Sequence, residues 1–205
     1  MPNWKTHIEI SKQLNKKLNY NDEEFELFAF GNILPDINNG HLVKDVSKII
    51  DHKITHFVAD KKSYINFYNK YKDIIKEPLI MGYYTHLYTD FSFNRNFYEH
   101  EEIKKRNNEE HSILRKMKQS DFEVYNNKFY EDTITIEYVD EILNQSRKIE
   151  EVSITKEDII KAKEFLDKQE KYNEDYKFYN EEELDILTEQ TINNLRNIIE
   201  NDTFI

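Results

Sequence analysis

One segment, residues 79–93, constrains this chain more than any other. It reads Leu-Ile-Met-Gly-Tyr-Tyr-Thr-His-Leu-Tyr-Thr-Asp-Phe-Ser-Phe, which is apolar or aromatic on nearly every side. Pro78 suits the first position of a helix, so we expect a helix to begin there. A helix that is hydrophobic all round is normally buried. The sequence therefore predicts a long helix in the centre of the fold.

This helix carries an ionisable pair, His86 and Asp90, at a spacing of four residues. Residues at that spacing share one helix face, so the pair presents a nitrogen and an oxygen to one point. Because burial of an unpaired carboxylate is costly, Asp90 requires a cation, hydrogen bonds or a proton. Gly82, one turn earlier on this face, is expected to leave space beside the pair. Two interpretations stay open, a buried ion pair and a metal site.

Glycine and proline are scarce, with three of each in 205 residues. This scarcity favours an all-α fold over sheets joined by tight turns. A chain of this length forms one domain with a substantial core. We therefore expect residues 1–205 to form a single compact multi-helix domain, and the alternating pattern at 133–138 is too short to predict a strand.

Capping residues mark where several helices should begin. Asn3 can cap a helix that runs to about Leu18, and Asn21 with Glu24 forms a capping-box pattern for a second helix. Pro35 bars that helix from continuing, which leaves the residue after it in a loop. Three more helices are expected from their caps. Asp60 can cap a helix that runs to about Ile75. Thr155 with Asp158 can cap a helix to Tyr172, and Asn180 with Glu183 a helix to Ile199. Further helical patterns cover 111–129 and 136–149, and 37–59 is a looser stretch.

Charge and composition narrow the functional classes. The formal net charge is −11, which argues against stable binding of nucleic acid. A phosphate substrate is still possible, because a bound divalent cation would invert the charge locally. Cysteine is absent, so a metal would be held by His, Asp, Glu or backbone groups, a set that suits zinc. Neither a leader pattern nor an apolar run of membrane-spanning length is present, and we expect a cytoplasmic protein without a transmembrane segment.

Histidines gather in the first half of the chain, six of the seven between positions 41 and 111. Five ionisable residues lie in an apolar or aromatic context, and these are the candidate ligands: His7, Asp36, His56, His86 and Asp90. Four others, each taken singly, fit surface or capping histidines better: His41, His52, His100 and His111. Four aromatic residues fit either a pocket wall or plain core: Trp4, Tyr83, Phe91 and Phe93.

Four segments form an ordered set of motifs: Thr-His-Ile-Glu-Ile-Ser at 6–11, Gly-Asn-Ile-Leu-Pro-Asp at 31–36, Thr-His-Phe at 55–57, and Met-Gly-Tyr-Tyr-Thr-His-Leu-Tyr-Thr-Asp at 81–90. Together they resemble the bacterial zinc-dependent phospholipase C family, whose fold is shared with fungal and plant single-strand nucleases. The last segment is similar to the family's most distinctive element, Gly-x3-His-x3-Asp on a buried helix. The resemblance covers about the first ninety residues, in the family's order.

This resemblance implies a zinc-dependent phosphoesterase, a hydrolase that uses metal-activated water on a small phosphodiester or a phospholipid head group. Zinc in such a site lowers the pKa of bound water towards about 7. The resemblance assigns the residue after Pro35 to orient or deprotonate that water, and it selects His56 over His52 as a ligand. It implies one zinc site from Asp36, His56, His86 and Asp90, and a second possible site from His7 and Asp90.

Departures from the family pattern keep an alternative open. The secreted phospholipases use three zinc ions, one of them held by an N-terminal tryptophan well before the first-helix histidine, whereas here Trp4 is internal and six residues precede His7. Asn96 replaces a histidine, and a later His-x3-Glu pair is missing, since Arg115 stands four residues after His111. The alternative is a catalytically degenerate metal-binding protein with a structural or sensing role. A purely structural helical domain is the third interpretation.

Overall fold

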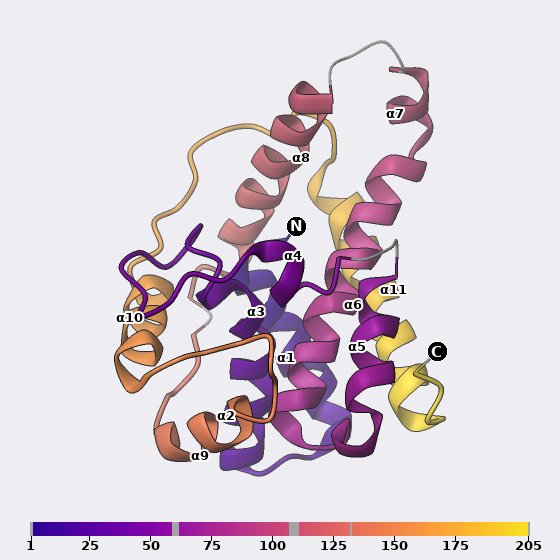
Figure 1. Ribbon diagram of the computed structural model, residues 1–205. Coiled ribbons are helices and arrows are strands. Elements are labelled where there is room, and N and C mark those ends of the chain that lie inside the picture. The colour runs from indigo at the N-terminus through magenta and orange to yellow at the C-terminus, as the bar shows by residue number, and fades with distance from the viewer. Residues whose placement is uncertain (1, 59–61, 107–110, 132, 205) are drawn as a thin grey trace.

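The fold is built from helices alone over the residues that can be described. The computed structural model describes residues 2–58, 62–106, 111–131 and 133–204. Within these ranges there is no strand, and residues 133–138 run as irregular chain. The helices pack into a single compact domain around one core (Figure 1). The predicted all-α fold class is therefore confirmed.

The α-helices in chain order are α1 (Trp4–Leu18), α2 (Asp22–Gly31), α3 (Leu34–Ile37), α4 (His52–Thr55), α5 (Ser63–Tyr71), α6 (Pro78–Glu99), α7 (Glu101–Lys105), α8 (His111–Asn126), α9 (Val139–Ser146), α10 (Lys156–Asp167) and α11 (Glu181–Glu200). Two short 3-10 helices, Lys72–Ile74 and Asn127–Phe129, follow α5 and α8. Within the described ranges, none of these helices combines the length and apolar character that a membrane crossing requires.

Most of the predicted helix starts are confirmed by cap hydrogen bonds. The Asn3 side chain accepts from the backbone N–H of Trp4, and α6 begins at Pro78. Capping boxes form at Asn21 with Glu24, Thr155 with Asp158, and Asn180 with Glu183. Helix ends are less well predicted, because α10 stops at Asp167 and α9 covers only Val139–Ser146. Asp60, the expected cap of the helix before α6, lies outside the described residues.

Helices α2 and α6 cross in backbone contact at two glycines. A Cβ atom on Gly82 would lie 2.1 Å from the carbonyl oxygen of Phe28, and one on Gly31 would lie 2.1 Å from that of Leu79. Real Cβ atoms essentially never come within 3.0 Å of another heavy atom in this way. The expectation that Gly82 leaves open space beside the ionisable pair is therefore wrong, because the α2 backbone fills that space.

The irregular stretch before α4 is fixed to the rest of the domain by polar contacts. The side chain of Asp158, which caps α10, also accepts hydrogen bonds from the backbone N–H of Ser47, at 2.7 Å, and from its hydroxyl. The side-chain amide of Asn38 donates to the carbonyl oxygen of Lys48 at 2.9 Å, and the backbone carbonyl of Asn38 accepts from the N–H of Ile50. These contacts fix the chain that leads into α4, and the side chain of Asp51 caps that helix.

Candidate metal centre

Five predicted ligand residues converge in the interior from four separate parts of the chain. His7 comes from α1, Asp36 from α3, His56 from the residue that ends α4, and His86 with Asp90 from α6. Each is at most 5 % exposed. A cluster of ionisable side chains this deeply buried requires specific compensation for its charge.

Asp36 lies in a short helix and not in the predicted loop. Pro35 occupies the first turn of α3, where its missing N–H costs nothing, so the proline ends α2 and also starts a new turn. Two donors hold the Asp36 carboxylate: the indole N–H of Trp4 donates to Oδ2 at 3.1 Å and the amide of Asn39 to Oδ1 at 2.8 Å. The direction of this carboxylate is therefore fixed by its neighbours.

Four side chains meet at distances that suit one tetrahedral ion. Nε2 of His56 lies 3.3 Å from Oδ1 of Asp36, 3.2 Å from Nε2 of His86 and 3.7 Å from Oδ2 of Asp90. Nε2 of His86 lies 3.4 Å from Oδ2 of Asp90. Ligand atoms held at zinc bond lengths of about 2.0–2.1 Å in a tetrahedron are roughly 3.3–3.4 Å apart. Nε2 of His86 and Oδ2 of Asp36 are further apart, at 4.0 Å. The spacing of His56 from the other three groups is therefore close to that of zinc ligands, and Asp36 and His86 would have to approach each other by a few tenths of an ångström.

A second group of contacts orients two of the imidazole rings. The carbonyl oxygen of Asn32 lies 2.8 Å from Nδ1 of His86, and its side-chain oxygen lies 3.2 Å from Nδ1 of His7. Because an oxygen of either kind can only accept, Nδ1 carries the proton in both rings and Nε2 keeps its lone pair. This arrangement, with an outer hydrogen bond fixing the tautomer, is typical of metal-binding histidines.

Three atoms of the five converging residues lack any hydrogen bond among the described residues. Among the described residues, Nε2 of His7 and both carboxylate oxygens of Asp90 are buried without a partner. Oδ1 of Asp90 lies 3.6 Å from Nε2 of His7, on the opposite side from the oxygen that faces His86. A bound cation would satisfy these acceptors, which hydrogen bonds do not. The residues present therefore fit a metal ion, and Asp90 could bridge two.

The pKa values of the clustered side chains are set by their burial and by the charges of their neighbours. Burial alone would lower the pKa of His86, but the charges of Asp90 and Asp36 raise it to about 9. Burial alone would raise the pKa of Asp90, but His86 and His7 hold it well below its usual value. Burial lowers the pKa of His7. Asp90 is thus ionised at neutral pH, and without a metal the His86 ring takes up a proton that a bound cation would displace from Nε2.

His52 is a residue of the cluster that the sequence analysis assigned to the surface. Its ring lies 3.7 Å from the ring of His56, and together with Asp36 these residues offer three ligand atoms within 4.8 Å of one another. Burial and the neighbouring His56 lower the pKa of His52 to about 4. The signal that points to His52 is its spacing of four residues from His56, the same as that of His86 and Asp90.

The other three histidines lie apart from this cluster or at its edge. His100 caps α7, where its Nδ1 accepts from the backbone N–H of Glu102, and this confirms the capping interpretation. His111 is exposed at the start of α8. His41 is exposed as well, with its ring 6.4 Å from that of His52.

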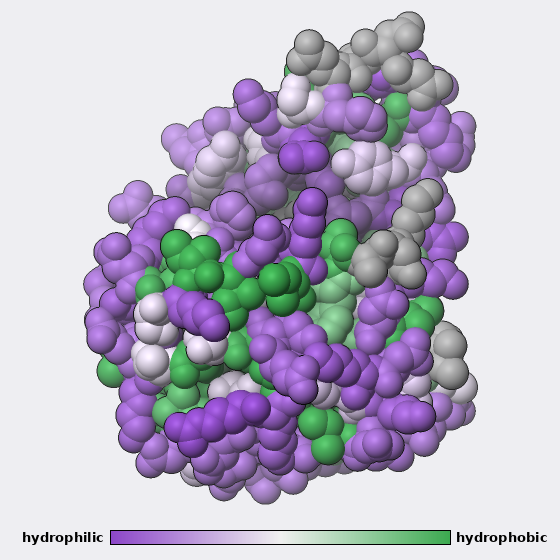
Figure 2. Space-filling model, viewed as in Figure 1, coloured by the Kyte–Doolittle hydropathy of each residue, from purple (hydrophilic) through white to green (hydrophobic). Residues whose placement is uncertain are grey.

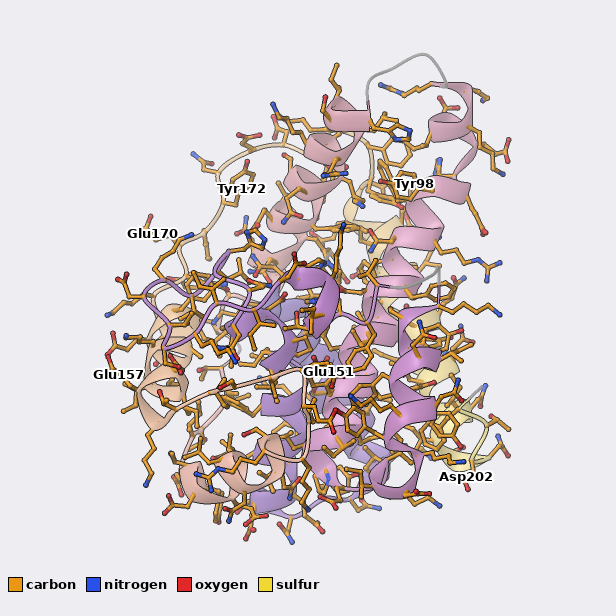
Figure 3. The ribbon with its side chains drawn as sticks, viewed as in Figure 1. Tyr98, Glu151, Glu157, Glu170, Tyr172 and Asp202 are labelled. Carbon is orange, nitrogen blue, oxygen red and sulfur yellow. The ribbon has the colours of Figure 1, made fainter. Side chains whose placement is uncertain are left out.

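A cavity of about 800 Å³ opens onto the cluster, and His52, His56 and Asp90 form part of its wall. Phe91 and Tyr98 line it further along α6. The remaining aromatic candidates are core residues: Trp4, Tyr83 and Phe93 are all fully buried. Figure 3 labels Tyr98 on the upper part of α6, near α8. Lys118 of α8 lies 4.9 Å above the Tyr98 ring, is 6 % exposed, and has its pKa lowered by burial to about 8.

Comparison with known proteins gives one match. No curated protein matches the chain, and no solved structure does. The family model for zinc dependent phospholipase C matches residues 6–195 of the 205. This span contains all five of the converging residues that the motifs single out, and it extends well beyond the first ninety residues that carry the resemblance. The chain therefore belongs to the zinc-dependent phospholipase C family.

Proposed function

We propose that the protein is a zinc-dependent phosphoesterase that hydrolyses a phosphodiester in a small molecule or a phospholipid head group. The observation that carries this proposal is the convergence of two carboxylates and three histidines beside a cavity of about 800 Å³, in a chain of this family. Cavities of roughly 300–1,000 Å³ are typical of sites for small ligands.

The residues that would hold one zinc ion are Asp36, His56, His86 and Asp90. The second oxygen of Asp90, which faces His7, would allow that pair to take part in a second site. Bound zinc would supply a water of lowered pKa and would neutralise charge on the phosphoryl oxygens. This ligand set accounts for every buried acceptor of Asp90 and His7 that lacks a hydrogen bond within the described chain.

Asp36 is the residue that we propose orients or deprotonates the attacking water. Burial alone would raise the pKa of Asp36, but the hydrogen bond with His56 and the charge of His86 lower it, so the carboxylate is ionised at neutral pH. The Trp4 and Asn39 donors fix its plane, which removes reorientation from the proton transfer. Asp36 therefore has the charge and the fixed direction to orient the water, and because its lowered pKa makes it a weak base, deprotonation by Asp36 depends on a metal that lowers the pKa of the water.

Surface chemistry near the cavity favours a substrate with an apolar part. Three large hydrophobic residues of the α4 region are exposed: Ile49 by 72 %, Ile54 by 52 % and Val58 by 49 %. Figure 2 shows hydrophobic residues gathered over the face that carries α4 and the stretch before it. Val58 also lines the cavity. A phospholipid would bring its head group to the cluster and its acyl part to this face, whereas the net charge of −11 disfavours stable binding of nucleic acid.

The alternative, a metal-binding protein without catalysis, is favoured by one observation. Asn96, which stands where the family has a histidine, accepts a hydrogen bond from the hydroxyl of Tyr179 at 2.7 Å. Its side chain is thus engaged in the packing of α6 against the chain before α11. A role in structure or sensing would need the metal but not the water.

Metal analysis followed by turnover separates these functions. The purified protein should contain at least one zinc ion per chain and should hydrolyse a nitrophenyl phosphodiester, losing activity on chelation and regaining it when zinc is added back. Asp36→Asn should abolish turnover, and the exposed Asp175→Asn should not. Zinc without turnover would support the alternative, and a protein that binds no zinc would contradict both. Parallel assays on phospholipid vesicles and on a soluble phosphocholine ester would identify the substrate class.

Two expectations about the whole chain remain predictions. One is that residues 1–205 act as a single zinc-dependent phospholipase C-like domain, which limited proteolysis would test by yielding one resistant fragment. The other is a cytoplasmic location, which fractionation of the native cells would test.

A further inference from the structure

A buried lysine without a carboxylate partner lies beside the cavity. Lys118 of α8 is 6 % exposed, and its ammonium donates to the side-chain oxygen of Asn94 at 2.6 Å. Among the described residues, no carboxylate forms an ion pair with this ammonium. The ammonium also lies over the rings of Phe97 and Tyr98, at 5.4 and 4.9 Å. Because burial of a charge without a counter-ion is costly, a group of this kind points to an anion as its ligand.

The lysine keeps its charge at neutral pH. Burial lowers the pKa of Lys118 to about 8, and the negative charge of Asp90 opposes that effect. An amine with a pKa of about 8 is mostly protonated at pH 7. A cation bound at Asp90 would cancel the negative charge of that carboxylate, and an anion in the cavity would replace it.

Asn94 connects this lysine to the candidate metal centre. It stands four residues after Asp90 on α6, so the two side chains share one helix face and are separated by a rise of about 6 Å. Both residues line the cavity. A phosphoryl group held at Asp90 therefore lies within about one helical turn of Asn94.

The hydrogen bond from Lys118 also fixes which way the Asn94 amide points. An ammonium can only donate, so the amide oxygen faces Lys118 and the amide nitrogen is directed away from it. Within the described chain, that nitrogen donates to no protein acceptor. Because Asn94 lines the cavity and Lys118 is buried behind it, the N–H groups of Asn94 are the donors offered to a ligand there.

Two other cations line the cavity, Lys62 and Arg95, and both are exposed. Arg95 is already paired with Glu99 at 2.9 Å. Solvent screens an exposed charge strongly and a buried charge much less. Lys118 therefore contributes a more persistent positive field to the cavity than these two side chains do.

We propose that Asn94 binds a phosphoryl oxygen of the substrate through its amide N–H group, and that Lys118 is a positioning residue that holds Asn94 in this direction and adds a fixed positive charge behind it. This inference rests on the proposed function. A preoriented donor backed by a buried cation stabilises negative charge on a phosphoryl oxygen. The ligand class is an anionic phosphate ester.

The affinity of the zinc-loaded chain for inorganic phosphate tests the pair without reference to turnover. Phosphate is titrated into each variant by calorimetry, in samples of equal zinc content. Asn94→Ala should weaken binding at least about tenfold, as expected for loss of a hydrogen bond to a charged group. Lys118→Met should also weaken it, because it removes the charge and frees the Asn94 side chain to turn. Lys116→Met is the matched control, since Lys116 is an exposed lysine of the same helix, and it should bind phosphate like the wild type.

Asn94→Asp separates a binding role from a structural one. Aspartate keeps the oxygen that faces Lys118 and would form an ion pair with the ammonium, so the Tm should be no lower than that of the wild type. The substitution removes the N–H donor and places a negative charge at the cavity. Phosphate binding should therefore fall further than in Asn94→Ala, although the packing of α6 against α8 is retained.

The outcomes separate this inference from the proposed function. Wild-type phosphate affinity in Asn94→Ala or Asn94→Asp would overturn the role of Asn94, and the same result in Lys118→Met would overturn the role of Lys118. An equal loss in Lys116→Met would show a general effect of charge and would count against the pair, as would a wild type that binds no phosphate. If the wild type hydrolyses the nitrophenyl phosphodiester but the Asn94 and Lys118 variants bind phosphate normally, only this inference fails. If phosphate binding follows the expected pattern but the wild type has no turnover, only the proposed function fails.

Discussion

Replacing Gly82 by Ala tests how closely α2 and α6 must approach. The new Cβ atom would lie 2.1 Å from the carbonyl oxygen of Phe28 and 3.0 Å from the backbone nitrogen of Asn32. Both are backbone atoms around the C-terminal end of α2, so no flexible side chain can turn away. The distance from this Cβ atom to the Phe28 carbonyl oxygen must increase to at least 3.0 Å, so one helix must move relative to the other.

Two effects of opposite sign determine how much Gly82→Ala changes the free energy of unfolding. Alanine is a better helix former than glycine by about 1 kcal/mol. Overpacking a filled interior costs about 1–3 kcal/mol, and more where backbone must shift. Because buried core residues flank this contact on both helices, we place the cost at the upper end. The net loss of stability is then about 2 kcal/mol, which for a chain of this length lowers the Tm by roughly 4–8 °C.

Thermal melts of Gly82→Ala, Gly31→Ala and the double variant provide the assay. Gly31 meets the Leu79 carbonyl at the same crossing, so once one alanine has separated the helices the second should add less than its own single effect. Zinc affinity should fall as well, because a shift of α2 takes the Asn32 carbonyl away from His86. A Gly82→Ala protein as stable as the wild type, or more stable, would refute the reasoning.

Two further predictions concern single carboxylates. Asp90→Ala should remove bound zinc and lower the Tm markedly. His111→Ala should change the free energy of unfolding by no more than about 0.5 kcal/mol and leave the metal content unaltered. Equal effects of the two substitutions in parallel melts and metal assays would count against this ranking. Burial alone would raise the pKa of Asp158, but hydrogen bonds from Ser47 and Thr155 outweigh it and lower the pKa below its usual 3.8. The carboxylate therefore stabilises the fold above that pH and stops doing so as the pH falls through its lower folded pKa. Asp158→Asn should cost about 1–2 kcal/mol at pH 7 and progressively less below pH 4, and a difference independent of pH in urea unfolding would contradict the assignment.

Local sequence signals predicted the helix starts because the interactions that make them are local. A capping box spans four residues, so Asn21 and Glu24 can be recognised without knowledge of the rest of the fold. The same holds for the start of α6 at Pro78 and for its burial, which follows from an apolar surface on every side. The five buried ligand candidates were recognisable because each is an ionisable residue in an apolar segment.

What the sequence did not predict depends on contacts between distant segments. Gly82 has its role because α2 lies against it, and nothing near it in the chain indicates this. Asp36 lies in a helix because Pro35 can begin a turn as well as end one. His52 is adjacent to the cluster only through the path of residues 38–51, which Ser47 and Asp158 hold from opposite parts of the chain. The spacing of four residues from His56 is a local sign that the two rings lie together, but the approach of both rings to Asp36 depends on this distant path.

The candidate ligands are carried by two kinds of element, and this difference has a consequence for metal exchange. His7, His86 and Asp90 are on α1 and α6, long helices that pack against each other in the core. Asp36 is on α3 and His56 directly follows α4, and each of these helices is a single turn of four residues. Short elements with few internal hydrogen bonds open locally at lower free energy than long buried helices do. If the proposed site binds zinc, we therefore expect Asp36 and His56 to adjust as an ion enters from the cavity, while the ligands on α1 and α6 stay in place.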